Sequence, residues 1–138
     1  MVQAGDRAPE FTVPKAGGEA YNDLGPFTLS EALGEGPVVL AFVPAAFTSA
    51  CTEELCTFRD AMALFNDRDA RVYDLSVDLP FSQNIWIREE GLTFPMLSDW
   101  EREVIHTYDA VLDDMYGSIE VARRTVFVVD AGRLWPAE

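Results

Sequence analysis

Runs of apolar residues divide the chain into segments that have the length of buried strands. Residues 37–43 are apolar throughout, and residues 125–129 contain three valines and a phenylalanine. Continuous apolar runs of this length are typical of strands that are buried on both faces of a sheet. Residues 71–77, which include Val72, Tyr73 and Val77, predict a third strand between them.

The spacing of apolar residues changes after Cys51. From there they recur every three or four positions, which is typical of a helix with one face on a core. These positions are Leu55, Phe58, Met62 and Phe65. Cys51 lies four residues before the first of them, and it therefore opens the predicted helix on its inward face.

Two further helices are predicted in the second half of the chain. The shorter one covers residues 81–90 and follows Pro80, which suits the first turn of a helix. The other is indicated by Val104, Ile105, Tyr108, Val111 and Leu112. Strands that alternate with helices predict an α/β fold, in one domain over residues 1–138, with a sheet covered on both sides.

The composition fits one globular domain with an acidic surface. Of the 138 residues, 49% are hydrophobic, and 24 acidic against 10 basic residues give a net charge of −14. Nucleic acids and anionic membranes are poor partners, because each phosphate would meet charge of its own sign. We interpret the acidic surface as a means of solubility, and adaptation to high salt is the alternative hypothesis.

The two cysteines and the single histidine limit the possible chemistry. Cys51, Cys56 and His106 are too few soft ligands for a four-ligand zinc site without carboxylates, so no metal is expected. His106 lies in a predicted helix with no catalytic partner near it in sequence, and we interpret it as structural. The tryptophans are interpreted as packing residues. They are Trp86, Trp100 and Trp135.

No segment has the roughly 20 consecutive apolar residues of a membrane span, and the first residues lack the pattern of a secretion signal. We therefore expect a soluble protein of the cytoplasm. In that compartment a structural disulfide between the cysteines is not expected.

The segment around Cys51 places a thiol where a buried strand leads into a helix. Unpaired backbone N–H groups and the helix dipole favour the thiolate at a helix start. Thr48 can place a hydroxyl beside the sulfur, although a helix-capping hydroxyl explains it equally well. Pro44 ends the strand, which is an ordinary role for a proline. The arrangement indicates a reactive cysteine.

The spacing Pro44-x-x-x-Thr48-x-x-Cys51 resembles the active-site motif of the peroxiredoxin family. Within the family the chain resembles the bacterioferritin comigratory protein, or peroxiredoxin Q, and AhpE-like subgroups. Further segments extend it from residue 5 to about residue 134, namely residues 5–11, 77–83, 94–99 and 124–130. It implies a thioredoxin-like fold, in which helices flank a central mixed β-sheet, and a thiol-dependent peroxidase that needs no cofactor.

The same resemblance implies roles for two charged residues. Arg124 would approach the sulfur of Cys51, lower its pKa and bind the peroxide oxygens, which suits the fixed fork of a guanidinium. Glu54 matches the glutamate that orients this arginine in many relatives, and a first-turn acid that interacts with the helix dipole is the alternative. Arg123 is expected to point to the other face of the strand. The Cys51 thiolate would attack a peroxide oxygen and become a sulfenic acid.

Cys56 resembles the cysteine that, in the peroxiredoxin Q subgroup, resolves the sulfenic acid as an intramolecular disulfide. In an ideal helix the Cα atoms of Cys51 and Cys56 lie about 8.6 Å apart, whereas a disulfide needs less than about 7 Å. Local unwinding is therefore part of the expected cycle. The alternative is that Cys56 is a packing residue and that an external thiol resolves Cys51.

Two features depart from the pattern of the family. Val43 stands before Pro44 where many relatives carry an aromatic residue, which leaves the substrate preference open. The chain ends at Glu138, where the family continues through a last strand into a helix, so the usual C-terminal helix is expected to be lacking. Pro136 would also interrupt strand pairing away from an edge.

The expected partners are a hydroperoxide substrate and a thioredoxin-like or other thiol reductant, in a monomer or homodimer. A peroxide sensor or redox relay that uses Cys51 in the same way is the main alternative function. A disulfide reductase of the thioredoxin type is less consistent, because four residues rather than two separate the cysteines. A non-catalytic acidic binding module would leave the motif unexplained.

Overall fold

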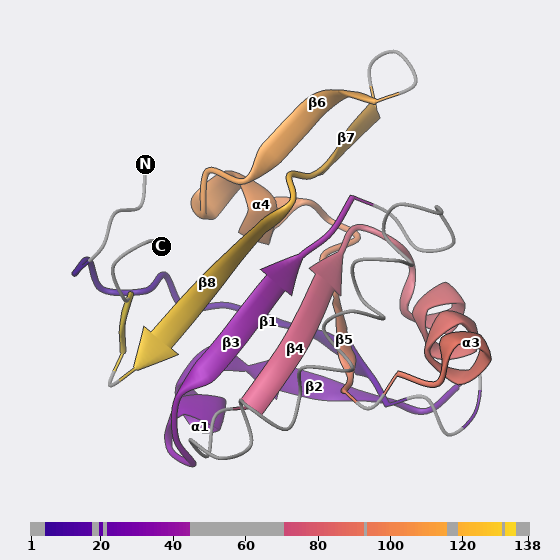
Figure 1. Cartoon of the computed structure of the whole chain (residues 1–138), viewed down its shortest axis with the longest axis horizontal. Coiled ribbons are helices and arrows are strands. Elements are labelled where there is room, and N and C mark those ends of the chain that lie inside the picture. The colour runs from indigo at the N-terminus through magenta and orange to yellow at the C-terminus, as the bar shows by residue number, and fades with distance from the viewer. Residues whose placement is uncertain are drawn as a thin grey trace.

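The structure is a computed structural model and describes residues 5–17, 20, 22–44, 71–92, 94–115, 119–130 and 132–134. Within these ranges seven strands form one mixed sheet in the order β2-β1-β5-β4-β3-β8-β9 (Figure 1). β3, β4 and β5 are parallel, and the other pairs are antiparallel. The strands are β1 (Thr12–Ala16), β2 (Leu24–Thr28), β3 (Val38–Phe42), β4 (Arg71–Ser76), β5 (Met96–Ser98), β8 (Thr125–Asp130) and β9 (Arg133–Leu134).

Helices and a separate hairpin accompany the sheet. The helices in the described ranges are α1 (Leu29–Leu33), α3 (Pro80–Glu90) and α4 (Glu103–Thr107). The hairpin consists of β6 (Val111–Met115) and β7 (Ile119–Ala122) and projects from the body beyond the start of β8 (Figure 1). None of the described helices is long and apolar enough to cross a membrane.

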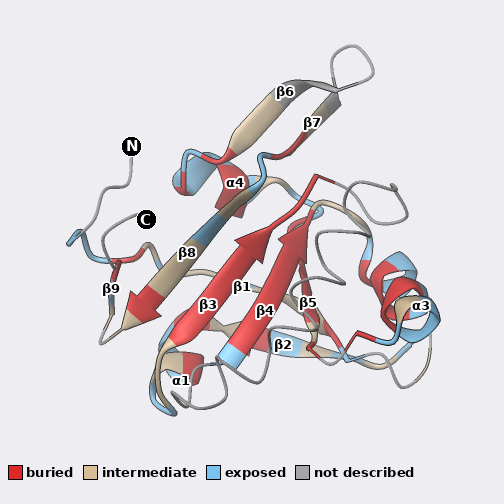
Figure 2. Cartoon of the chain, viewed as in Figure 1, coloured by how far each residue is buried: buried red, intermediate tan, exposed pale blue. Residues whose placement is uncertain are grey.

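The three strands predicted from apolar runs are confirmed as β3, β4 and β8. The expected burial on both faces holds for β3 but is wrong for β8, in which Val126 is 44% exposed and only Val129 is buried. Every residue of β3 is buried, and β4 is buried from Val72 to Ser76 (Figure 2). β3 pairs in parallel with β4, from Val38 opposite Arg71 to Phe42 opposite Leu75. A strand with neighbours on both sides and cover on both faces has no polar surface, which explains why its sequence is continuously apolar.

The two faces of the sheet carry separate hydrophobic cores, because side chains alternate between the faces along each strand. On one face the strands pack against α4, in a cluster that includes Leu40, Phe42, Leu75, Val104 and Ile105. On the other face they pack against α3, in a cluster that includes Val39, Val72, Trp86, Ile87 and Met96. α3 and α4 therefore cover opposite faces, as predicted for an α/β fold.

α3 begins and ends as the sequence predicts. Pro80 occupies its first turn, where the N–H that proline lacks is not needed. Gly91 follows the last turn with a φ of 63°, and Leu92 N–H donates to Ile87 O at 3.1 Å. A glycine suits this left-handed cap, because a side chain there would be strained.

The predicted helix from Val104 to Leu112 is wrong in its second half. α4 ends at Thr107, and Asp109 takes a left-handed conformation with a φ of 54°. Ala110 N–H donates to Ile105 O at 2.7 Å and Asp109 N–H to His106 O at 3.1 Å, the two bonds of a Schellman cap. Val111 then starts β6 opposite Ala122, so its apolar side chain belongs to a strand.

β1 and β2 form a hairpin that the apolar pattern does not reveal. Pro14 faces Pro26 across the two strands. Neither proline has an N–H to donate, so this pair occupies a position without hydrogen bonds between the strands, and both nitrogens point away from the partner strand. β2 is the first strand of the sheet, so the nitrogen of Pro26 lies along its free edge.

The tryptophans and His106 occupy different environments. Trp86 is fully buried, as expected for a packing residue, but Trp100 is 46% exposed, so the packing interpretation is wrong there. Trp135 lies outside the described ranges. His106 lies in α4 with its Nε2 3.0 Å from Oε1 of Glu120 on β7, a contact that ties the helix to the hairpin and agrees with a structural role.

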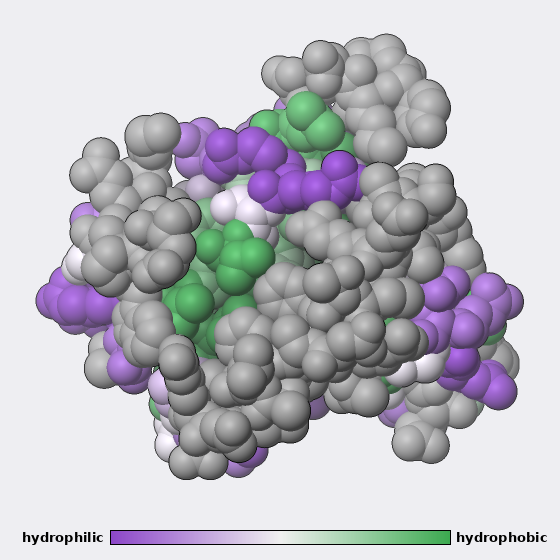
Figure 3. Space-filling model, in the orientation of Figure 1, coloured by the Kyte–Doolittle hydropathy of each residue, from purple (hydrophilic) through white to green (hydrophobic). Residues whose placement is uncertain are grey.

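An apolar patch lies over β8 on the face of the sheet that Figure 3 shows. Val126 of β8 is 44% exposed, whereas Val128 is half-buried against the α3 core. β8 pairs with β3 on one side and with the two-residue strand β9 on the other. The expected lack of a C-terminal helix concerns residues after Leu134, which lie outside the described ranges, and it stays a prediction.

The contribution of buried side chains in the sheet to stability can be tested with two leucines that differ in burial. Leu40 is fully buried in β3, and Leu24 of β2 is 37% exposed. We expect Leu40→Ala to lower the free energy of unfolding by about 2–5 kcal/mol, because it leaves a cavity between packed side chains. Leu24→Ala should cost less than about 1 kcal/mol. Urea denaturation measures both, and equal losses would contradict the described burial.

Candidate functional site

The carboxyl ends of the parallel strands β3, β4 and β5 meet at one edge of the sheet (Figure 1). In open α/β sheets, this is the edge where binding sites lie. At this edge Val43 and Pro44 follow β3, and both are buried. Val43 N–H donates to Leu75 O at 2.9 Å, so the chain is still fixed to β4 one residue before Pro44.

Arg124 lies at the same end of β3. β3 and β8 are antiparallel with Phe42 opposite Thr125, so Arg124 stands one residue beyond that pair, at the height of Val43. Its side chain is exposed. The antiparallel register thus brings Arg124 and Pro44, which are 80 positions apart in the sequence, to the same sheet edge.

Arg123 and Arg124 lie between β7 and β8 and not within a strand, so the alternation expected for Arg123 does not apply. Arg123 Nη2 donates to Asp109 O at 2.9 Å, and its backbone N–H donates to Ala110 O at 2.8 Å. Both bonds connect the turn before β8 to the cap of α4. Both arginines are exposed, and Arg123 is held by its hydrogen bonds to the cap of α4.

The remaining predicted site residues lie outside the described ranges. They are Thr48, Cys51, Glu54 and Cys56, together with the helix predicted after Cys51. Of the predicted site, the structure places Pro44 and Arg124. The positions of the thiols and of Thr48 and Glu54 stay predictions.

A buried polar network, which the sequence analysis missed, joins the ends of β4 and β5. Gln83 Nε2 on α3 donates to Ser76 Oγ and to Leu97 O, both at 2.9 Å. Ser76 Oγ donates to Asp78 Oδ2 at 2.8 Å, and Ser98 Oγ donates to Asp78 O at 2.7 Å. Two of the segments that carry the family resemblance, 77–83 and 94–99, contain most of these residues, but their side-chain types alone give no spacing signal.

Asp99 connects the carboxyl end of β5 to α4. Its Oδ1 accepts Val104 N–H at 3.1 Å and its Oδ2 accepts Ile105 N–H at 2.8 Å. Burial raises the pKa of Asp99, and the backbone hydrogen bonds from α4 lower it in part. These bonds satisfy N–H groups at the helix start that would otherwise be buried without partners.

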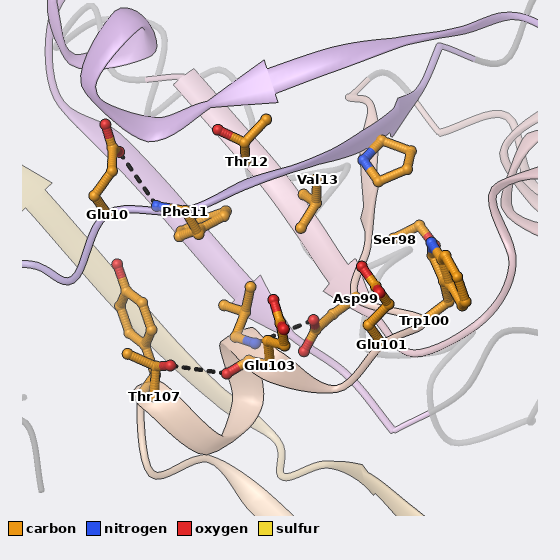
Figure 4. Close-up of a pocket in the computed structure, with 13 residues that line it drawn as sticks. Glu10, Phe11, Thr12, Val13, Ser98, Asp99, Trp100, Glu101, Glu103 and Thr107 are labelled. Carbon is orange, nitrogen blue, oxygen red and sulfur yellow. Dashed lines mark hydrogen bonds between the residues drawn. The ribbon is translucent and has the colours of Figure 1, made fainter.

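A pocket of about 140 Å³ lies between β1 and the segment from β5 to α4 (Figure 4). Aromatic and acidic side chains line it, including Phe11, Trp100, Tyr108, Asp99, Glu101 and Glu103. Tyr108 donates its hydroxyl to Pro9 O at 2.7 Å, and burial together with the charge of Glu10 raises its pKa well above the ordinary value. The acidic lining of this pocket disfavours the binding of anions, and neither Pro44 nor Arg124 lines the pocket.

Among the residues that the structure describes, no group of three or more histidine, cysteine, aspartate or glutamate side chains can hold a metal ion. The hydrogen bonds at the sheet edge instead hold backbone ends in place. What this edge offers chemically is a fixed strand end that leads toward Cys51, and a guanidinium beside it.

The mixed sheet with helices on both faces, and a site at the carboxyl ends of its parallel strands, define a thioredoxin-like α/β protein. The structure is similar to peroxidoxin BcpB from Mycobacterium tuberculosis, with a TM-score of 0.83 and 31% identity over 97% of this chain and 82% of that one. It also shares its fold with a variant of PrxQ from Xylella fastidiosa, with a TM-score of 0.85 and 22% identity over 99% and 85% of the two chains.

Sequence comparison leads to the same class. The chain is 34% identical to alkyl hydroperoxide reductase E of Mycobacterium tuberculosis over 131 residues, which are 94% of this chain and 80% of that protein. It is 31% identical to a chloroplastic 2-cysteine peroxiredoxin of Chattonella marina var. antiqua over 136 residues, covering 94% and 66% of the two chains. The AhpC/TSA family matches residues 4–134. The chain therefore belongs to the AhpC/TSA family of peroxiredoxins, and it is a thiol-dependent peroxidase.

The carboxylate of Asp99 gives a prediction about stability and pH. The pKa of Asp99 in the folded protein is raised above the ordinary value of 3.8. The folded protein therefore binds the proton of this carboxyl group more tightly than the unfolded chain does. The stability that the group contributes is present at low pH and is lost as the pH rises from 3.8 through the folded pKa.

The free energy of unfolding of the wild type, relative to Asp99→Asn, should therefore fall as the pH rises over this window. Urea denaturation of both proteins, from about pH 3.5 to pH 7, measures this difference. A difference that grows with pH would mean that the backbone hydrogen bonds outweigh burial.

Proposed function

We propose that Cys51 is the sulfur that this peroxidase uses to reduce hydroperoxides. The observation that carries this proposal is the position of Pro44 and Arg124 at the same end of the central sheet. Pro44 begins the segment of the chain that contains Cys51. Arg124 supplies the positive charge that stabilises a thiolate and the developing charge on a peroxide oxygen. A guanidinium close to a thiolate at a helix start favours the ionised, nucleophilic form.

In the proposed reaction the Cys51 thiolate attacks one oxygen of the hydroperoxide. An S–O bond forms while the O–O bond breaks, and the leaving oxygen takes a proton to become water or an alcohol. The sulfur is oxidised to a sulfenic acid as the peroxide is reduced. Negative charge develops on the leaving oxygen, where Arg124 and the Thr48 hydroxyl would stabilise it, with Glu54 orienting the arginine.

Cys56 is proposed to complete the cycle. Its thiol condenses with the sulfenic acid of Cys51, which forms a disulfide and releases water. The two cysteines are five positions apart, so the first turns of the predicted helix would have to unwind to bring their sulfurs together. An external thiol, such as a thioredoxin-like protein in the cytoplasm, then reduces the disulfide by thiol exchange.

We propose that the chain acts as a monomer or a homodimer.

The role of Cys51 is tested by peroxide consumption with a thioredoxin system. We expect Cys51→Ser to abolish turnover. Arg124→Ala should lower the rate of thiol oxidation about 100-fold, as for the loss of one donor to developing charge. Arg123→Ala is the matched control, because it removes a neighbouring exposed guanidinium, and it should react at the wild-type rate. Normal turnover in Cys51→Ser would reject the assignment, and stoichiometric oxidation without turnover would favour a redox relay.

The role of Cys56 is tested by the mass of the intact protein after one equivalent of hydrogen peroxide. A disulfide leaves the wild type lighter by two hydrogens, about 2 Da, whereas Cys56→Ser should accumulate sulfenic acid or its further oxidation products. Wild-type protein that instead holds a stable sulfenic acid would show that an external thiol resolves Cys51.

A further inference from the structure

Gln83 is a buried amide on the inward face of α3, and its side chain is 0% exposed. Its Nε2 makes two hydrogen bonds, to Ser76 Oγ and Leu97 O. Its Oε1 has no hydrogen-bond partner among the residues that the structure describes. An acceptor buried in this way costs free energy that a methionine or leucine would avoid. A gain in folding stability therefore does not explain why an amide occupies this position. We look for the explanation in the two groups to which its N–H groups donate, Ser76 Oγ and Leu97 O.

The hydrogen bonds around Gln83 run in one direction. Leu97 O can only accept, so the nitrogen of the amide and not its oxygen must face it. Ser76 Oγ accepts a hydrogen bond from the second N–H of the amide, and its own O–H donates a hydrogen bond to Asp78 Oδ2, 2.8 Å away. Through these side chains, hydrogen-bond donation runs from Gln83 to Ser76 and from Ser76 to the carboxylate of Asp78.

The carboxyl end of β5 loses its backbone pairing on the β1 side only, whereas on the β4 side Ser76 faces Ser98 and Asp99 N–H donates to Ser76 O at 2.9 Å. β5 is three residues long, and its ladder with β1 ends where Lys15 faces Leu97. The next β1 residue is Pro14, which has no N–H to continue the ladder. Ser98 instead donates its hydroxyl to Asp78 O at 2.7 Å.

The network reaches the strand that leads to Cys51 through one backbone bond. Val43 N–H donates to Leu75 O at 2.9 Å, and Leu75 directly precedes Ser76. Pro44 follows Val43 and begins the segment that contains Cys51. A displacement of Ser76 is therefore transmitted to the point where this segment leaves the sheet.

We propose that Gln83 is a positioning residue of the peroxidase site. Its two N–H groups fix the carboxyl ends of β4 and β5, and through them the direction in which the chain leaves β3 toward Cys51. This inference rests on the proposed role of Cys51. Gln83 acts here by holding backbone, and takes no part in the chemical steps.

The test compares two buried amides of the same helix. Gln83→Met keeps the side-chain length and removes both N–H donors. Asn84→Leu is the matched control, because Asn84 is also 0% exposed and its Nδ2 donates to Asp23 O at 3.3 Å, next to β2. The reduced full-length proteins are oxidised with hydrogen peroxide in a stopped-flow instrument over a range of pH, and urea denaturation gives their unfolding midpoints.

We expect Gln83→Met to react about 10- to 100-fold more slowly, as for a reacting group displaced by a fraction of an ångström to 1 Å. The apparent pKa of the reacting thiol should also shift, while the unfolding midpoint is no lower than that of Asn84→Leu. Asn84→Leu should react at the wild-type rate with an unshifted pH profile. A wild-type rate in Gln83→Met, or equal losses in both variants, would overturn the positioning role.

Ser76→Ala is a second variant that breaks the same network one hydrogen bond further on, and it serves where Gln83→Met does not fold. It should also lower the rate and shift the pH profile, and a wild-type rate would count against the proposal. Cys51→Ser separates the two hypotheses. Oxidation at the wild-type rate in Cys51→Ser would reject the proposed function itself, whereas loss there beside a wild-type rate in Gln83→Met would reject only the positioning role.

Discussion

The parallel pairing of β3 with β4 is the interaction on which the rest of this structure depends. Both strands lie in the middle of the sheet and are buried on both faces, so each face needs its own cover, which α3 and α4 supply. Parallel strands also point their carboxyl ends to one edge. The pairing that organises the two cores therefore brings Pro44 and Ser76 to one end of the sheet, and the parallel pairing of β4 with β5 adds Asp99.

The fold was predictable where one physical signal dominates and unpredictable where two compete. β3, β4 and β8 follow from apolar runs, and α3 follows from Pro80 in its first turn. β1 and β2 were missed because their prolines argue against strands, and the pairing of Pro14 with Pro26 in a position without hydrogen bonds cannot be read from either strand alone. The helix predicted from Val104 to Leu112 was wrong after Thr107, because the helical spacing of apolar residues continues past the left-handed Asp109.

The candidate site divides in the same way. Pro44 and Arg124 were identified from a motif and a resemblance, and the antiparallel register of β3 and β8 then brings them to one end of the sheet. Gln83, Ser76 and Asp99 were missed, because a glutamine or a serine in an ordinary segment has no characteristic spacing. Their importance arises from burial and from the early end of the β1–β5 ladder, which are properties of the tertiary structure.

The two prolines of the first hairpin have a consequence for the behaviour of the molecule in a crowded solution. An edge strand with free N–H groups is a template on which another chain can add a strand and start an aggregate. Pro26 removes the middle donor from the outer side of β2, and at the opposite edge β9 is only two residues long. Both margins of the described sheet thus resist growth by strand addition, and mutual repulsion between chains of net charge −14 acts in the same direction.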